Sequence, residues 1–97
     1  DCDALGQTLA AAKSAAVACR LMPADTCAER LQDECGCDFP VVDAESTQGR
    51  AYVDTRTTFL ARCPTACIGL VCNPVPNAEC FSENGNLTAG QCVARPN

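Results

Sequence analysis

The sequence predicts a mostly α-helical, small disulfide-rich domain. Three observations lead to this prediction: ten cysteines among 97 residues, an alanine-rich segment near the N-terminus, and few large apolar side chains. A cysteine at about one position in ten is typical of disulfide scaffolds. The chain has three phenylalanines, one tyrosine and no tryptophan, and alanine and cysteine bury little area each. We therefore expect a single domain over residues 1–97 in which disulfides supplement a thin core.

Residues 3–20 are predicted to form the first helix. One stripe of this segment, at helical spacing, carries Leu5, Leu9, Ala12, Ala16 and Cys19. Alanines occupy most of the other faces. Two interpretations of these alanines remain open. They reflect high intrinsic helix propensity, or they form a second contact face of the helix. In the second case, the small side chains allow a partner chain to approach closely.

A second helix is predicted from Thr26 to about Cys35, and it would form a helical hairpin with the first. Residues 26–29 read Thr-Cys-Ala-Glu, which matches the capping box, and Gly36 suits a left-handed C-cap. The connection over residues 21–25 is short, and helices joined by a short turn lie antiparallel.

A third helix follows an extended segment. Residues 37–42 are expected to be extended, because Pro40 disfavours helix before it and valines favour strand. Residues 51–62 are predicted to be helical, and Pro64 ends that helix. The helical part of the domain would therefore span residues 1–62.

The remaining residues, 63–97, are predicted to form a cysteine-rich part made of turns and a loop or β-hairpin. Asn84-Gly85 is a strong hairpin signal, and it lies between Cys80 and Cys92.

All ten cysteines are candidates for disulfide bonds, because their number is even and an oxidising compartment would pair them. They are Cys2, Cys19, Cys27, Cys35, Cys37, Cys63, Cys67, Cys72, Cys80 and Cys92. The pairs that we expect are Cys19–Cys27, across the turn between the helices, Cys80–Cys92, which closes the hairpin loop, and Cys2–Cys37. A continuous first helix would hold Cys2 and Cys19 about 25 Å apart, too far for a bond.

No catalytic, cofactor-binding or metal-binding residue is predicted, and we expect a protein that is not an enzyme. Without histidine, neither a Ser-His-Asp nor a Cys-His arrangement can form. Cys35-Gly36-Cys37 resembles a redox pair, but it follows a predicted helix C-terminus among acidic residues, where a thiolate is disfavoured. Cys63-x3-Cys67-x4-Cys72 does not have the spacing of a common zinc or iron–sulfur site.

The charge and hydropathy patterns exclude further classes of partner. The formal net charge is −5 and Lys13 is the only lysine, so binding to nucleic acid or to an anionic membrane surface is disfavoured. No apolar run is long enough to span a membrane. The chain begins Asp1-Cys2-Asp3, with neither a basic region nor a hydrophobic run, and we expect it to be an already processed, exported form.

These observations favour an extracellular or cell-surface structural or interaction module that is non-catalytic and self-assembles or binds another extracellular protein. No small-molecule ligand is expected under this hypothesis. The alternative is a small binding protein, either a protein inhibitor or a carrier of lipids or small molecules. A third hypothesis is a thiol redox protein that uses Cys35 and Cys37.

The cysteine rhythm and its flanking residues resemble those of a known group. The pattern runs Cys19…Cys27…Cys35-Gly36-Cys37-Asp38-Phe39-Pro40-Val41-Val42, then Cys63…Cys67…Cys72…Cys80…Gly90-Gln91-Cys92-Val93. It looks like that of cysteine-rich secreted proteins and lipoproteins of myxobacteria and their relatives, which implies an exported, surface-associated protein and no particular activity. Plant lipid-transfer proteins are also small, helical and disulfide-rich, but this chain lacks their adjacent Cys-Cys pair.

Overall fold

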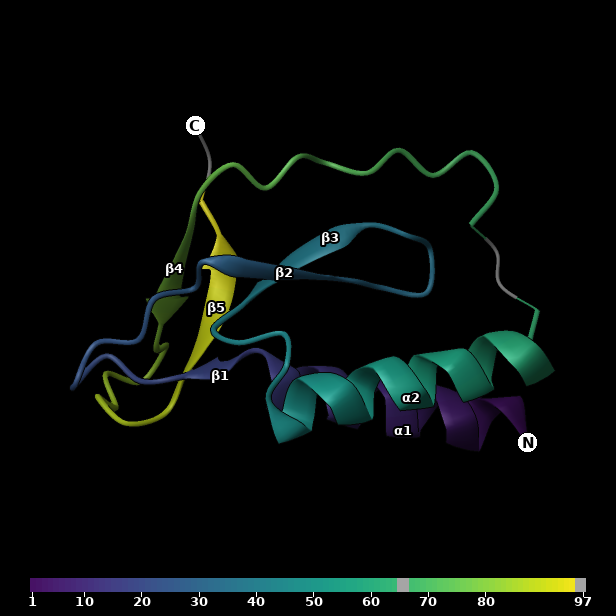
Figure 1. The fold of residues 1–97 in the computed structure, drawn as a ribbon, viewed down its shortest axis with the longest axis horizontal. Helices are drawn as coiled ribbons and strands as arrows, with labels where there is room; N and C mark the ends of the chain where they lie inside the picture. The colour runs from purple at the N-terminus through teal and green to yellow at the C-terminus, as the bar shows by residue number, and fades with distance from the viewer. Residues whose placement is uncertain (65–66, 96–97) are drawn as a thin grey trace.

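The protein combines two antiparallel helices with two small antiparallel sheets. The computed structural model describes residues 1–64 and 67–95. Its elements, in chain order, are α1 (Cys2–Ala16), β1 (Ala18–Cys19), β2 (Glu29–Gln32), β3 (Asp38–Val41), α2 (Thr47–Arg62), β4 (Ala78–Phe81) and β5 (Gly90–Ala94). Figure 1 shows α1 and α2 lying side by side along one edge of the molecule, with the β2–β3 hairpin above them and the β4–β5 hairpin at one end.

Short polar side chains begin both helices. Asp1 caps α1 by accepting a hydrogen bond from the backbone N–H of Asp3 at 3.1 Å, and Ser46 caps α2 in the same way through Gly49 at 3.0 Å. The Cys2–Cys63 disulfide joins the start of α1 to the residue after α2, so the helices run antiparallel. No described helix has the length and apolar character needed to cross a membrane.

The strands form two separate antiparallel sheets. One sheet has the order β1-β5-β4, with Cys19 opposite Gly90 and Cys80 opposite Cys92. The other contains β2 and β3, with Leu31 opposite Phe39.

The core lies where the helices meet the strands, and it is small. Tyr52 of α2 and Val41 of β3 are the largest fully buried side chains. Phe39 packs edge-on against Tyr52, with ring centroids 5.1 Å apart, and the ammonium of Lys13 lies 4.7 Å from the centre of the Phe39 ring. Three buried cysteines, Cys19, Cys27 and Cys92, complete the same cluster.

The prediction of a mostly helical fold is wrong, and the main error is the second helix. Residues 29–32, inside the segment predicted as helix 26–35, form β2 and pair with β3. The Glu29 side chain, expected in a capping box, instead accepts a hydrogen bond from Ala44 N–H at 2.9 Å. Gly36 does have a positive φ of 79°, but it turns the β2–β3 hairpin. Pairing with the extended segment that contains Pro40 stabilises residues 29–32 as a strand more than their local helix propensity stabilises a helix.

The first predicted helix also ends early, because Ala18 and Cys19 form a strand that pairs with β5. Other elements follow the prediction. Residues 51–62 lie within α2, and residues 37–42 contain the extended strand β3. Residues 80 and 92 lie in the two strands of the expected C-terminal β-hairpin.

Five disulfides pair all ten cysteines: Cys2–Cys63, Cys19–Cys80, Cys27–Cys92, Cys35–Cys67 and Cys37–Cys72. The three expected pairs, Cys19–Cys27, Cys80–Cys92 and Cys2–Cys37, are therefore wrong. Two of these pairs, Cys19–Cys27 and Cys2–Cys37, assume a helical hairpin that does not form. The third, Cys80–Cys92, assumes that the bond closes the loop between two neighbouring strands. In the structure, each of the first five cysteines bonds to one of the last five, over separations of 32 to 65 residues.

The Cys19–Cys80 disulfide explains why a glycine, Gly90, is required in the middle strand of the larger sheet. Cys19–Cys80 joins β1 to β4, and β5 lies between those strands, so the bond passes over β5 at Gly90, the residue opposite Cys19. A Cβ added at Gly90 would lie 2.9 Å from the Cys80 sulfur, and also 2.9 Å from the backbone oxygen of Phe81. Neither neighbour can move freely, so the position requires glycine.

We expect Gly90→Ala to destabilise the fold by about 1–3 kcal/mol, because the added methyl group overlaps the disulfide. Gly6→Ala in α1 is the matched control. Its Cβ would meet Phe59 at an ordinary 3.8 Å, so the substitution should stabilise the helix by roughly 0.5–1 kcal/mol. Urea unfolding followed by circular dichroism measures both changes. Equal stability of Gly90→Ala and the wild type would contradict the proposed crossing.

Tyr52 is fully buried, and its hydroxyl oxygen has no hydrogen-bond partner among the described residues. Burial raises the pKa of Tyr52 to about 12, and the nearby charges of Glu34 and Asp33 add to the increase while Arg56 opposes it. In the unfolded chain the group has its ordinary pKa of 10.0. The stability that a neutral Tyr52 gives the folded state is therefore fully present below pH 10. It is lost as the pH rises toward 12, because in that window Tyr52 ionises in the unfolded chain but not in the folded protein.

We expect wild-type stability to fall with increasing pH over this window by up to about 1.4 kcal/mol per pH unit from Tyr52 alone. Tyr52→Phe removes this dependence. At pH 7 the variant should be as stable as the wild type, since the lost hydroxyl makes no hydrogen bond. The difference between the two urea midpoints across the pH series isolates Tyr52, because the two proteins differ at that position alone. A Tyr52→Phe protein with the wild-type alkaline slope would refute the assignment.

Candidate functional site

The first candidate site is a loop fastened at both ends, residues 67–72, which we call the stapled loop. Cys67 bonds to Cys35 and Cys72 bonds to Cys37, so both ends are anchored to the turn of the β2–β3 hairpin. Within the loop, Leu70 N–H donates to the backbone oxygen of Cys67 at 3.1 Å, and Gly69 has a φ of 80°. The loop is therefore a constrained turn.

Three apolar side chains project from the stapled loop into solvent. Ile68 is 100% exposed, Val71 is 83% exposed and Leu70 is 57% exposed. Single exposed apolar residues are common on protein surfaces, whereas a contiguous group held in one conformation is a feature of interaction sites.

The loop is anchored to an acidic part of the chain. Glu34 and Asp38 flank the anchoring cysteines Cys35 and Cys37 in the sequence. Asp33 accepts hydrogen bonds from the backbone N–H groups of Cys35 and Cys37, both at 2.9 Å. These three carboxylates place negative charge at the base of the apolar loop, and Arg56, which donates to the backbone oxygen of Gln32, is a cation close to them.

Arg30 of β2 supports the chain that follows the loop. Its Nη2 and Nε donate to the backbone oxygen of Val75 at 3.0 and 3.3 Å, and its Nη1 donates to the backbone oxygens of Cys27 and Glu29, both at 2.9 Å. One half-buried guanidinium thus ties the 73–77 segment to the β2–β3 hairpin. No pattern in the sequence indicates this role for Arg30, because Val75 is 45 residues away in the chain.

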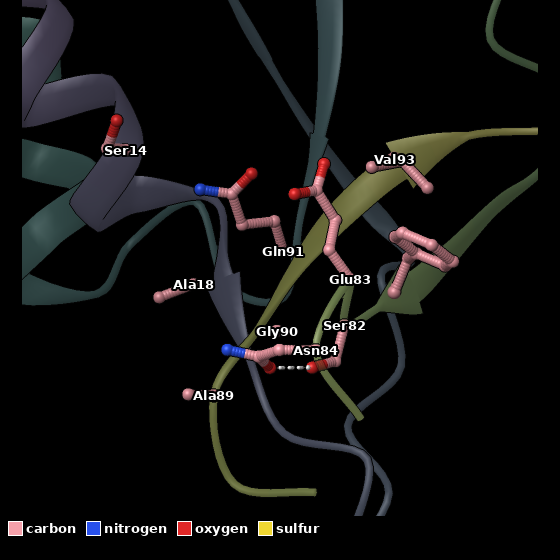
Figure 2. A pocket seen from close by; sticks show the side chains of 10 residues that line it. Ser14, Ala18, Ser82, Glu83, Asn84, Ala89, Gly90, Gln91 and Val93 are labelled. Atoms are coloured by element: carbon pink, nitrogen blue, oxygen red, sulfur yellow. Dashed lines mark hydrogen bonds between the residues drawn. The ribbon is translucent and has the colours of Figure 1, made fainter. Parts of the chain in front are cut away.

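The second candidate site is a pair of hollows between α1 and β5, which we call the α1–β5 groove. The first hollow, of about 380 Å³, lies beside the β4–β5 connection, and the second, of about 400 Å³, lies over Phe39. Ser14 and Gln91 line both hollows. Figure 2 shows the first hollow, with the Gln91 side chain reaching toward the end of α1 that carries Ser14 and the Glu83 carboxylate beside it.

The buried cysteines form a third cluster, but it has no ligand chemistry. The sulfurs of Cys19, Cys27 and Cys92 lie within 4.8 Å of one another. Cys27 is bonded to Cys92, and Cys19 to Cys80, and a disulfide sulfur lacks the thiolate charge that binds metals. Cys35 and Cys37, the pair behind the redox hypothesis, are bonded to different partners, Cys67 and Cys72.

The sequence contains one local signal for the stapled loop. Ile68-Gly69-Leu70-Val71 is an apolar run between two cysteines in an otherwise turn-rich region. Without the disulfide partners, nothing indicated that the run would face solvent.

Comparison with known proteins identifies no relative of this chain: no family model, no curated protein and no solved structure matches it. The resemblance to myxobacterial cysteine-rich proteins therefore remains a prediction.

We expect Arg30→Ala to loosen the 73–77 segment and to cost roughly 1–3 kcal/mol, because several backbone oxygens lose a charged donor. Hydrogen exchange and limited proteolysis within 73–77 report the local effect. Arg50→Ala is the matched control, since among the described residues the Arg50 side chain forms only a solvent-exposed ion pair, with Glu45 at 3.2 Å, and such pairs contribute at most about 1 kcal/mol. Identical exchange rates in the two variants would show that Arg30 does not support the segment.

Proposed function

We propose that this protein is an extracellular, non-catalytic interaction module that presents its stapled loop to another protein. The observation that supports this proposal is the combination of three exposed apolar side chains with two disulfides at the base of the loop. A loop that is already constrained loses little conformational entropy when it binds. Its aliphatic side chains can then fill a pocket as anchors.

The location of the protein is part of the same proposal. Five disulfides are consistent with an oxidising environment. We infer that the chain is secreted or held at the cell surface, where such bonds persist.

The partner that fits this surface has an apolar pocket with a basic rim. The apolar side chains of the loop would enter the pocket, and Glu34 and Asp38 beside the anchoring cysteines would face the rim. Such charge complementarity steers association and excludes wrong partners. A second copy fits less well, because the chain carries a net charge of −5 and identical acidic surfaces repel each other.

A photo-reactive amino acid placed at Ile68 tests the proposal in the organism that makes the protein. We expect one discrete extracellular protein to become crosslinked, and Val71→Ser in the same chain to abolish the product by removing a neighbouring anchor. Because Val71 is 83% exposed, this substitution should leave folding unchanged, which unfolding curves verify.

The matched control carries the same photo-reactive group at Glu45, whose side chain is 77% exposed and lies outside the loop. Equal crosslinking from both positions would count against the loop as the binding surface. A product consisting of two copies of this chain would replace the proposed partner with self-association.

A further inference from the structure

The α1–β5 groove is independent of the stapled loop and has a different chemistry. The first hollow is lined by residues of α1, β1, β4, β5 and the β4–β5 connection, and the second by residues of α1, β3 and β5. In Figure 1 the β4–β5 hairpin lies at one end of the longest axis, while the chain that follows the grey segment at residues 65–66 starts toward the other end and then runs back to β4. A ligand in the groove would therefore leave the loop free.

Three polar side chains of the groove are not engaged by the rest of the described protein. The side chains of Ser14, Glu83 and Gln91 make no hydrogen bond or ion pair within residues 1–64 and 67–95. Asn84 is partly engaged, since its Oδ1 accepts from the Ser82 hydroxyl at 3.0 Å, as Figure 2 shows. Together these groups offer both donors and acceptors to a ligand.

An aromatic ring borders the polar groups in each hollow. Phe81, at the end of β4, lines the first hollow and is 49% exposed. Phe39 lines the second and is 7% exposed, with the Lys13 ammonium above its ring. The exposed ring of Phe81, next to hydroxyl and amide groups that make no internal hydrogen bond, suits a ligand that has both C–H faces and hydroxyl groups.

The charges of the groove cancel, and this constrains the ligand. Glu83 is the charged residue of the first hollow and Lys13 is that of the second. The groove is therefore neutral overall, in a chain whose net charge is −5. A polyanion would meet the negative field of the whole protein, and a cation would meet Lys13 along the groove. An uncharged ligand fits best.

From these observations we propose that the α1–β5 groove binds a neutral oligosaccharide of at least two pyranose rings. One ring lies against Phe81 in the first hollow and the next enters the second hollow. Gln91, which both hollows share, bridges the two rings with hydrogen bonds to their hydroxyl groups. Each hollow is in the ~300–1,000 Å³ range of small-molecule sites. The proposal replaces the expectation, drawn from the sequence, that no small-molecule ligand binds.

The intact, disulfide-bonded protein labelled with ¹⁵N provides the test. Four uncharged probes are titrated and followed by NMR: cellotetraose, chitotetraose in its N-acetylated form, maltotetraose and xylotetraose. We expect at least one of them to bind with a Kd of about 1 mM or lower and to shift the amides of Ser14 and Gln91. Binding should weaken by about tenfold when the tetrasaccharide is replaced by its monosaccharide, because only one hollow is then filled.

Variants assign the binding to the groove. Gln91→Ala and Phe81→Ala should each raise the Kd by about tenfold or more, a loss of about 1.4 kcal/mol. Both side chains are exposed, so the fold should persist, and a wild-type disulfide map confirms it. Leu70→Ser in the stapled loop is the control and should leave the Kd unchanged.

Two outcomes would overturn the proposal. The first is that none of the four oligosaccharides shifts an amide of the groove. The second is that the groove binds tetramethylammonium instead and loses that binding in Glu83→Gln, which would make it a cation site. Retained oligosaccharide binding in Glu83→Gln supports the proposal, because the amide of glutamine can replace the carboxylate as a partner for sugar hydroxyls.

Discussion

The structure depends on five covalent bonds that all connect the first part of the chain to the last. Cys2, Cys19, Cys27, Cys35 and Cys37 each bond to a cysteine between residues 63 and 92. In the chain-entropy model, one disulfide that closes a loop of about 60 residues lowers the entropy of the unfolded chain and so raises its free energy by about 4 kcal/mol. Such crosslinks compensate for a core in which Tyr52 and Val41 are the largest fully buried side chains.

The same crosslinks determine which surfaces are available for binding. Because Cys35–Cys67 and Cys37–Cys72 constrain the stapled loop, its aliphatic side chains can stay in solvent and still keep one arrangement. A loop held only by packing would have to bury those side chains to be ordered. The Cys19–Cys80 bond acts on the other site, since it holds β1 and β4 across Gly90 and so brings together elements that line the first hollow.

Helix α2, strand β3 and the C-terminal hairpin could be predicted from sequence because each has a local cause. Ser46 caps α2, Pro40 favours an extended conformation in β3, and Asn84-Gly85 turns the chain between β4 and β5. The segment 26–35 was mispredicted because its local signals, a capping-box pattern and a following glycine, agreed on a helix. Neither candidate site was predicted. The α1–β5 groove combines residues that are distant in sequence, and the stapled loop owes its constraint to disulfides with the distant Cys35 and Cys37.

By itself, the sequence determined the chemistry of the crosslinks, the thinness of the core and the positive φ of Gly36. These properties follow from residue type or from a few neighbouring residues. Only the tertiary structure decided the partner of each cysteine, the strand conformation of residues 29–32 and the exposure of Ile68. The disulfides join cysteines 32 to 65 residues apart, and β2 pairs with β3 on the other side of a hairpin turn. No local pattern within one segment specifies which other segment provides its contact.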